Sequence, residues 1–456
     1  MLHLFKIIIG GLILLGLIAL LILHLVALST RSRAADVLAQ VVAARDDATA
    51  DMAARALIEL KDTDIIPVLD ARFDAAGNHG IKTRIVKVVD AIAADEGRDL
   101  LLKALGDPDV LVSSEAALAL AKRGEPAVLD LARERLESDD PRIAGLSFEI
   151  LGYLQDGFID GIESELNSSS PDRMPGALRG LVPMIQRGND RAWRLLKRAI
   201  NSRFAEVRLA AYDAAVGLSG EKRAEALMTA TTESTDPALR KKAIHEMANG
   251  QDASAFIDTL KLALNDDDLG VKFAAAWGLY KLRDPTPVPY MRSVLNNKEQ
   301  SLANRIIAAR LLARLGDPQG AGPMYDILDD VELSPDIKLE AAEVLGEYDE
   351  IKGMGYLGEA IKPDRPFDLR LKALDMLGIM GNKNAEVLLK DMASDDPDEI
   401  IAVRSAYAYT SLTGGKRSAI LRRFLRSDND EVRTLAAVGI LTGGDITDII
   451  GEEGYK

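Results

Sequence analysis

The chain of 456 residues contains no cysteine, which excludes disulfide bonds, thiolate metal sites and cysteine nucleophiles. Aromatic residues make up only 5% of it, and this scarcity disfavours a β-sandwich, whose strands draw on tyrosine, phenylalanine and threonine. Positive charge is also in deficit, because 56 lysine and arginine residues stand against 71 aspartate and glutamate residues, a net charge of −15. Such acidity argues against non-specific nucleic-acid binding over the whole surface.

Residues suited to catalysis are equally scarce. No two of the four histidines have the i, i+4 spacing of a metal-binding helix. No serine lies in a glycine-flanked nucleophile elbow, and Gly414-Gly415-Lys416 lacks the spacing of a phosphate-binding loop. We therefore predict a non-enzymatic protein with no cofactor, no metal and no small-molecule substrate.

A long apolar run stands at the start of the chain. Ile7–Leu28 contains 22 residues without a charge. At ~1.5 Å per residue it reaches ~33 Å, enough to cross the ~30 Å hydrocarbon core of a bilayer. A cleaved signal peptide has a shorter apolar core of about 7–15 residues, although Ala27 and Ser29 would suit cleavage. We predict that residues 1–33 are an uncleaved, single-pass anchor in the cell membrane.

The orientation of this anchor is nearly balanced. Lys6 precedes the apolar run, whereas Arg31, Arg33 and Arg45 follow it. Counting basic residues near the ends of the span gives a weak preference for a cytoplasmic location of the following domain. A periplasmic or other extracytoplasmic location of the domain stays open, because a short N-terminal tail with a lysine is equally compatible with the cytoplasm.

Residues 34–456 repeat with a period of about 32 residues. The residue before the reference position of each repeat is apolar except at Asn304, and the residue seven after it is apolar except at Ser411. Seven repeats have alanine three residues after the reference. This spacing places the apolar residues on one face of an α-helix. The reference positions are Lys82, Leu111, Ala144, Pro175, Arg208, Arg240, Lys272, Arg305, Lys338, Arg370, Arg404 and Arg433.

Each repeat is predicted to be a helical hairpin. The first helix is expected to begin at a capping residue followed by proline and often to end near glycine. These caps are Asp107, Asp140, Asp236, Ser334 and Asp396, and the glycines are Gly124, Gly152, Gly188, Gly220, Gly250, Gly316 and Gly381. Second helices are expected, for example, at Pro126–Glu137, Ala253–Leu264 and Asn384–Met392. An additional first hairpin lies around Ala50–Phe73, and a truncated last one, with Ile446–Ile450, is interpreted as a terminal cap.

Stacking of about 12–13 such hairpins predicts an all-α solenoid, because one hairpin cannot bury its apolar face alone. The pattern resembles HEAT repeats, in particular the short bacterial class of phycobilisome-lyase-like proteins, over roughly residues 50–445. The matching segments are Asp107–Val110, Asp236–Arg240 with Ala243, Leu315–Pro318, and Asp430–Arg433 with Ala436. The resemblance implies that the recurrent arginines join repeats in a ladder rather than bind nucleic acid; these are Arg208, Arg240, Arg305, Arg370, Arg404 and Arg433.

Two second helices are basic although the protein is acidic. One interpretation is a solvated face with salt bridges to acidic neighbours, and the other is a docking patch for an acidic protein segment or for lipid headgroups. Trp193 and Trp277 are expected in the core or in a groove, where either would be a binding anchor. The candidate partner-binding residues are Arg187, Arg191, Trp193, Arg194, Lys197 and Arg198, with Arg203 beside them, and Lys416, Arg417, Arg422, Arg423 and Arg426.

The sequence favours a membrane-anchored scaffold or adaptor whose repeat surface docks one or more protein partners. Two alternatives stay open. One is a structural component of a large membrane or envelope complex, and the other, by resemblance alone, is an enzyme or chaperone similar to the bilin lyases. The sequence identifies neither the partner nor the pathway.

Overall fold

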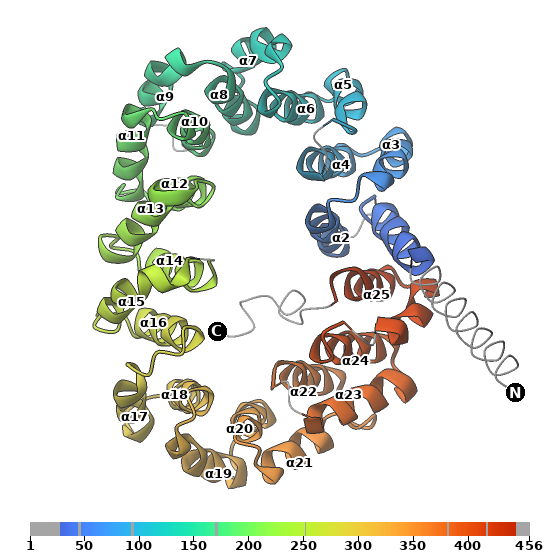
Figure 1. The fold of residues 1–456 in the computed structure, drawn as a ribbon, viewed down its shortest axis with the longest axis vertical. Coiled ribbons are helices and arrows are strands. Elements are labelled where there is room, and N and C mark those ends of the chain that lie inside the picture. Colours follow the sequence, from blue (N-terminus) through green and yellow to red (C-terminus); the bar gives the residue numbers. More distant parts are fainter. Residues whose placement is uncertain are drawn as a thin grey trace, which may run out of the picture. The chain divides into compact units, whose positions relative to one another are not determined.

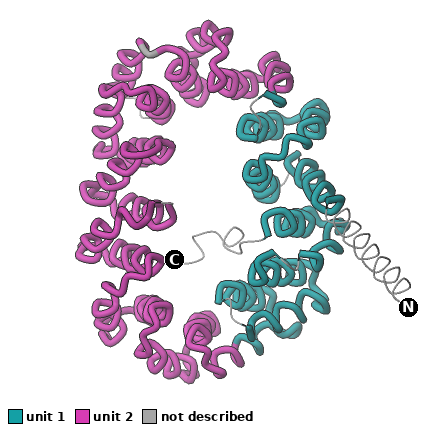
Figure 2. The backbone as a smooth tube through the Cα atoms, in the orientation of Figure 1, with its two compact units in different colours: residues 1–97, 357–456 teal, residues 98–356 magenta. Residues whose placement is uncertain are grey.

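The computed structural model describes residues 28–43, 47–92, 95–168, 172–250, 252–380, 383–415 and 418–443. All regular elements in these ranges are helices, so the predicted all-α fold is confirmed (Figure 1). The chain divides into two compact units (Figure 2). Unit 1 combines residues 1–97 with residues 357–456, and unit 2 is residues 98–356.

Unit 2 is a series of helical hairpins whose first helices lie along one side and whose second helices lie along the other (Figure 1). Its first helices are α6 (Val110–Lys122), α8 (Pro141–Leu154), α10 (Met174–Gln186), α12 (Ala205–Val216), α14 (Pro237–Asn249), α16 (Leu269–Lys281), α18 (Leu302–Arg314) and α20 (Pro335–Glu347). Its second helices are α5 (Arg98–Leu105), α7 (Leu129–Arg135), α9 (Ile159–Leu166), α11 (Asp190–Ile200), α13 (Gly220–Thr232), α15 (Ile257–Ala263), α17 (Val288–Asn296), α19 (Ala321–Asp329) and α21 (Ile351–Ala360), the last of which crosses the unit boundary. Four of them follow 3₁₀ turns, η2 (Pro126–Val128), η3 (Asp156–Phe158), η4 (Ala253–Phe256) and η5 (Pro318–Gly320).

Unit 1 combines helices from the N-terminal and the C-terminal parts of the chain. Its N-terminal part has a helix over residues 28–41, then α2 (Asp47–Leu60), η1 (Thr63–Ile65), α3 (Ile66–Ala75) and α4 (His79–Ile92). Its C-terminal part has α22 (Phe367–Met380), α23 (Lys383–Asp395), α24 (Glu399–Leu412), η6 (Ser418–Arg426) and α25 (Asp430–Thr442). Helix α2 packs against α25, and Arg31 donates a hydrogen bond of 3.5 Å to the Leu441 carbonyl, 410 positions away. Helix α25 is therefore covered by α2, whereas the segment interpreted as a terminal cap, Ile446–Ile450, lies outside the described residues.

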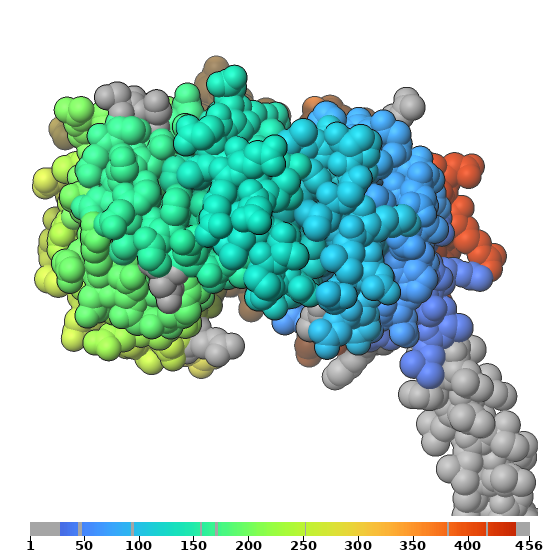
Figure 3. All heavy atoms as spheres, turned by 90° about the horizontal axis from the view of Figure 1, so that it is seen from above, coloured from blue at the N-terminus to red at the C-terminus, as the bar shows by residue number. Residues whose placement is uncertain are grey.

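Alanine at the recurrent position lets neighbouring repeats approach closely, as predicted. All seven of these alanines are fully buried: Ala211, Ala243, Ala275, Ala308, Ala341, Ala373 and Ala436. The side chains of successive repeats in unit 2 fill the space between them, as the cyan to green spheres in Figure 3 show. One continuous cluster of buried side chains runs from Phe148 on α8 to Leu279 on α16.

Glycines bring α8 and α10 closer than alanine would allow. A Cβ atom on Gly152 would lie 2.1 Å from the Gly180 carbonyl oxygen, and one on Gly176 would lie 2.1 Å from the Gly145 Cα. Gly152 lies near the end of its helix, as predicted, and α8 continues two residues further, to Leu154. By contrast, Gly124, Gly188 and Gly316 follow their helices with positive φ, as the prediction requires.

The capping predictions hold for three of the five helices. Asp140, Asp236 and Ser334 accept hydrogen bonds from backbone N–H groups of α8, α14 and α20. Asp107 and Asp396 do not cap their helices, because each lies two residues before the capping residue. In each Asp-Pro-Asp sequence the second aspartate caps the helix. Asp109 caps α6 and Asp398 caps α24, and each accepts hydrogen bonds from two backbone N–H groups.

Several predictions fall on residues that the structure does not describe. The apolar run Ile7–Leu28 lies outside the described residues except for Leu28, as do Ile446–Ile450, Gly381, Lys416 and Arg417. Within the described ranges, no helix is both long enough and apolar enough to cross a membrane. The predicted second helices at residues 126–137, 253–264 and 384–392 are confirmed, the first two with 3₁₀ starts.

Candidate functional site

Most cations of the first basic helix, α11, are engaged within the solenoid. Arg191 Nη1 lies 2.7 Å from Asp160 Oδ1 and also pairs with Glu163, both on α9. Lys197 Nζ lies 2.8 Å from Glu225 Oε1 on α13, and this hydrogen bond raises the pKa of Lys197. Arg198 donates to the side chain of Asn167 at 3.3 Å. These contacts favour the interpretation of a solvated face, because the charges join α11 to its neighbours.

The remaining candidates around α11 differ in what they offer to a partner. Arg187 donates to the Gly152 and Tyr153 carbonyls at the end of α8, at 2.7 and 3.1 Å. Trp193 is only 6% exposed, with Lys222 Nζ 5.0 Å from the centre of its ring. Arg194 is exposed and has no charged or hydrogen-bonding partner in the described part of the chain. Little of this helix is therefore left for a partner.

In the second basic segment, η6, more of the arginines lack an ion-pair partner among the described residues than in α11. Buried Leu421 and Phe424 anchor η6, and three residues per turn place Arg423 and Arg426 on a different face from them. Arg423 donates to the Ser394 carbonyl at 3.0 Å. Arg422 and Arg426 are exposed, and neither has an ion pair or hydrogen bond within the described ranges.

A hollow of about 500 Å³ separates η6 from the first described helix. From η6 it is lined by Arg422, Arg423, Leu425 and Arg426, and from the N-terminal helix by Ser29, Thr30 and Arg33. Both sides belong to unit 1. This hollow could not be predicted from the sequence, because its two segments are neighbours only through the packing of the first repeat on the last.

The recurrent arginines form the predicted ladder. Arg240 is the clearest case, since it holds both carboxylate oxygens of Asp266 at 2.7 and 2.8 Å and donates to the Ser234 carbonyl at 2.9 Å. Burial alone would raise the pKa of Asp266, but the hydrogen bonds from Arg240 bring it below its ordinary value. Arg208 likewise joins the Ser202 carbonyl to Asp236, whereas Arg433 bonds to the Ser427 carbonyl and to Asp430 of its own helix.

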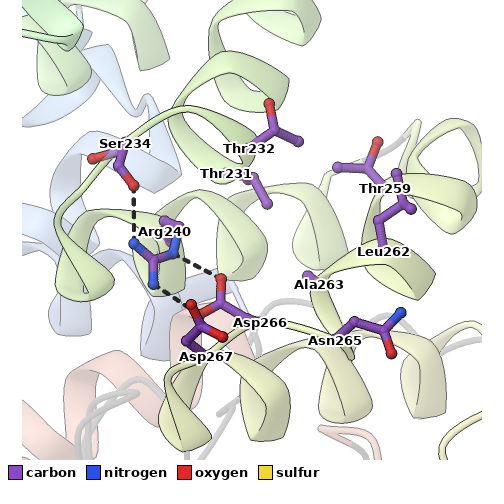
Figure 4. A pocket seen from close by; sticks show the side chains of 10 residues that line it. All are labelled: Thr231, Thr232, Ser234, Arg240, Thr259, Leu262, Ala263, Asn265, Asp266 and Asp267. Atoms are coloured by element: carbon purple, nitrogen blue, oxygen red, sulfur yellow. Dashed lines mark hydrogen bonds and ion pairs between the residues drawn. The ribbon is translucent and has the colours of Figure 1, made fainter.

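The cavity drawn in Figure 4 lies over this ion pair and measures about 410 Å³. Thr231 and Thr232 from α13, and Thr259 and Leu262 from α15, form its walls. Because the Arg240 guanidinium is already paired with Asp266, we assign the cavity to the junction of two repeats rather than to a ligand.

An aromatic stripe on α16 faces away from the core. Phe273, Trp277 and Tyr280 follow an i, i+4, i+7 pattern about 140–160° around the helix from buried Ala275, and each is half-buried. Helices α14 and α18 lie on either side of α16 in the same row (Figure 1). The His245 ring is 5.1 Å from Trp277, and the Arg314 guanidinium is 6.0 Å from the Tyr280 ring.

This aromatic stripe was only partly visible in the sequence. Trp277 was expected in the core or a groove, but Phe273 and Tyr280 were not singled out. The signal was present as three aromatics on one helical face in a chain with few aromatics, at positions +1, +5 and +8 from the reference. Those positions lie opposite the buried −1, +3 and +7 face.

Two segments of the chain, residues 73–148 and 224–303, match the family model of HEAT repeats, so the chain contains the predicted repeats. No curated protein matches the sequence significantly. Among solved structures, it is similar to YibA of Escherichia coli, with 18% identity, a TM-score of 0.34, and coverage of 57% of this chain and 95% of that one. It is also similar to the CpcE–CpcF complex of phycocyanin lyase from Nostoc sp. PCC7120, with 17% identity, a TM-score of 0.35 and coverage of 55% and 94%. For yeast importin-β the values are 12% identity, a TM-score of 0.37 and coverage of 93% and 74%.

Proposed function

We propose that this protein is a membrane-anchored, non-enzymatic scaffold that docks protein partners on the first-helix row of unit 2. The observation that carries the proposal is the aromatic stripe of Phe273, Trp277 and Tyr280 on α16. Large aromatic side chains flanked by cations are typical binding anchors, because they bury much apolar area and lose little conformational freedom. Lys281, 4.6 Å from the Trp277 ring, supplies flanking charge, whereas Arg314 beside Tyr280 is paired with Glu347.

The membrane part of the proposal depends on the apolar run Ile7–Leu28. Its length and lack of charge suit a single span of the cell membrane. A scaffold with this anchor would hold its partners at the membrane surface, with the count of basic residues favouring the cytoplasmic side weakly.

Affinity capture from gently solubilised membranes tests the docking surface. The full-length protein and its Trp277→Ala variant are compared, with Val387→Ala as a control that removes an apolar group 60% exposed on α23. We expect the partners to be retained by the wild type and the control but reduced at least about tenfold by Trp277→Ala. Equal recovery by all three proteins contradicts docking on α16.

The same preparation separates the remaining alternatives. Resistance to extraction by alkaline carbonate supports the anchor, and release into the soluble fraction contradicts it. Partners in a fixed stoichiometric assembly would favour a structural component of a larger complex. A bilin chromophore bound after incubation would favour a lyase-like activity.

A further inference from the structure

We propose that the hollow between η6 and the N-terminal helix binds the phosphate of an anionic phospholipid headgroup. This inference deepens the proposed membrane anchoring and rests on it. The site is formed by Arg33, Arg422 and Arg426, with Ser29 and Thr30 at its edge.

The chemistry of the lining suits a phosphate. Four of its seven residues are arginines, two carry hydroxyl groups, and none is acidic. Arginine presents a planar set of N–H donors that matches phosphate oxygens, and such charge-assisted hydrogen bonds are stronger than neutral ones.

Within the described residues, no carboxylate pairs with the exposed arginines of the hollow. Arg33, Arg422 and Arg426 are exposed, and within the described residues none of them has an ion pair or a hydrogen bond. The contrast with α11 is direct, because Arg191 and Lys197 there have carboxylate partners. A cluster of like charges in a protein of net charge −15 is stabilised when an anion occupies it.

The position of the hollow, next to the predicted membrane span, favours a lipid headgroup as the source of the phosphate. Ser29 follows the apolar run directly, and Arg33 lies only one helical turn, ~6 Å, further along. Basic residues this close to the end of a membrane span lie at the level of the headgroups, where anionic lipids attract them. An acidic protein segment would need no such proximity to the span.

The fold holds the two halves of the site together. Arg31 bonds to the Leu441 carbonyl, and α2 packs on α25. Arg423 fixes η6 to the end of α23 through the Ser394 carbonyl, which leaves Arg422 and Arg426 for the ligand. The site is therefore assembled by folding and does not depend on a single flexible basic tail.

The test uses the full-length protein in an uncharged detergent. It is titrated with dihexanoyl-phosphatidylglycerol, dihexanoyl-phosphatidylcholine and inorganic phosphate as separate probes. The variant is Arg422→Glu with Arg426→Glu. The control, Arg194→Glu with Arg203→Glu beside α11, makes the same change of charge at exposed residues outside the hollow. Thermal unfolding by circular dichroism checks that both variants fold.

We expect the wild type and the control to bind phosphatidylglycerol at least about tenfold more tightly than phosphatidylcholine, and the Arg422/Arg426 variant to lose this preference. Equal binding of both lipids by the wild type, or an equal loss in the control, overturns the site. Inorganic phosphate or an acidic peptide that binds as tightly as phosphatidylglycerol and displaces it overturns the lipid assignment. Failure of the anchoring would appear separately, as release by alkaline carbonate with the lipid preference intact.

Discussion

At the scale of single residues, recurrent arginines such as Arg240 and Arg370 connect two repeats at once. Arg370 shows this most completely, because it is 4% exposed, donates to the Ile361 carbonyl at 3.1 Å and pairs with buried Asp396. The resemblance to HEAT repeats was enough to predict that these arginines are structural. It did not predict that Asp396 pairs with Arg370 while Asp398 caps the helix, because both are plausible caps beside one proline.

Replacing Arg370 with methionine is expected to lower the free energy of unfolding by about 3–5 kcal/mol, because Asp396 is left as a buried, unpaired charge. Urea unfolding measures the loss. Arg365→Met, at a side chain 46% exposed, serves as the control and should change stability by less than about 1 kcal/mol. Adding Asp396→Asn to Arg370→Met should recover part of the loss; a double variant as unstable as the single one would argue against the buried-charge explanation.

Asp375 on α22 predicts a pH dependence of stability. Burial raises its pKa to about 6 from the ordinary value of 3.8, although Arg404, at 3.6 Å, acts in the opposite direction. The folded protein therefore retains a proton that the unfolded chain has lost. Its stabilising contribution is complete below pH 3.8 and disappears as the pH rises through about 6, a change of about 3 kcal/mol.

Asp375→Asn removes this titration, because the amide does not ionise. We expect the stability of the variant relative to the wild type to increase from pH 4 to pH 7, as measured by urea unfolding at each pH. Asp368→Asn, at an exposed position on the same helix, is the control. Parallel pH profiles for the wild type and Asp375→Asn would contradict the prediction.

At the scale of the elements, the helix pairs follow the sequence period closely, but glycine does not have one meaning. Gly124 and Gly316 end helices through a positive φ, whereas Gly152 lies inside α8 and allows contact with Gly180. A glycine near the expected end of a helix is compatible with either role. Only the position of the neighbouring helix distinguishes them, and a single sequence does not contain that information.

The contact between α8 and α10 predicts a large effect of one methyl group. In Gly152→Ala the new Cβ would lie 2.1 Å from the Gly180 carbonyl oxygen, and backbone must move to relieve the overlap. We expect a loss of about 3 kcal/mol in the free energy of unfolding. Gly157→Ala, where a Cβ meets nothing within 4 Å, is the matched control. Similar stability of both variants in urea unfolding would refute the close packing.

At the scale of the whole molecule, the sequence period described contacts between consecutive repeats only. It therefore gave no indication that the first and last repeats pack on each other in unit 1. The contact is reflected in how much of α25 is buried. Nine of its residues are buried, more than an exposed terminal helix would need: Val432, Thr434, Leu435, Ala436, Ala437, Val438, Gly439, Ile440 and Leu441.

Hydrogen exchange tests this contact directly. A variant lacking residues 1–60, and with them α2, should exchange the backbone amides of α25 at least about tenfold faster than a variant lacking only residues 1–27. Amides of α16 in unit 2 provide an internal reference and should be unaffected. Equal protection of α25 in the two variants would mean that α2 does not cover it.

The meeting of the chain ends in unit 1 has a mechanical consequence. A pull between the start of the chain and its last described helix is first resisted by the Arg31–Leu441 hydrogen bond and the α2–α25 packing. The hairpins of residues 98–356 lie in the chain between these two points, so they carry no tension until that contact breaks. Unit 1 would then resist extension up to one threshold force, at which the α2–α25 contact breaks. A solenoid whose first and last repeats are not in contact would instead extend gradually as the force increases.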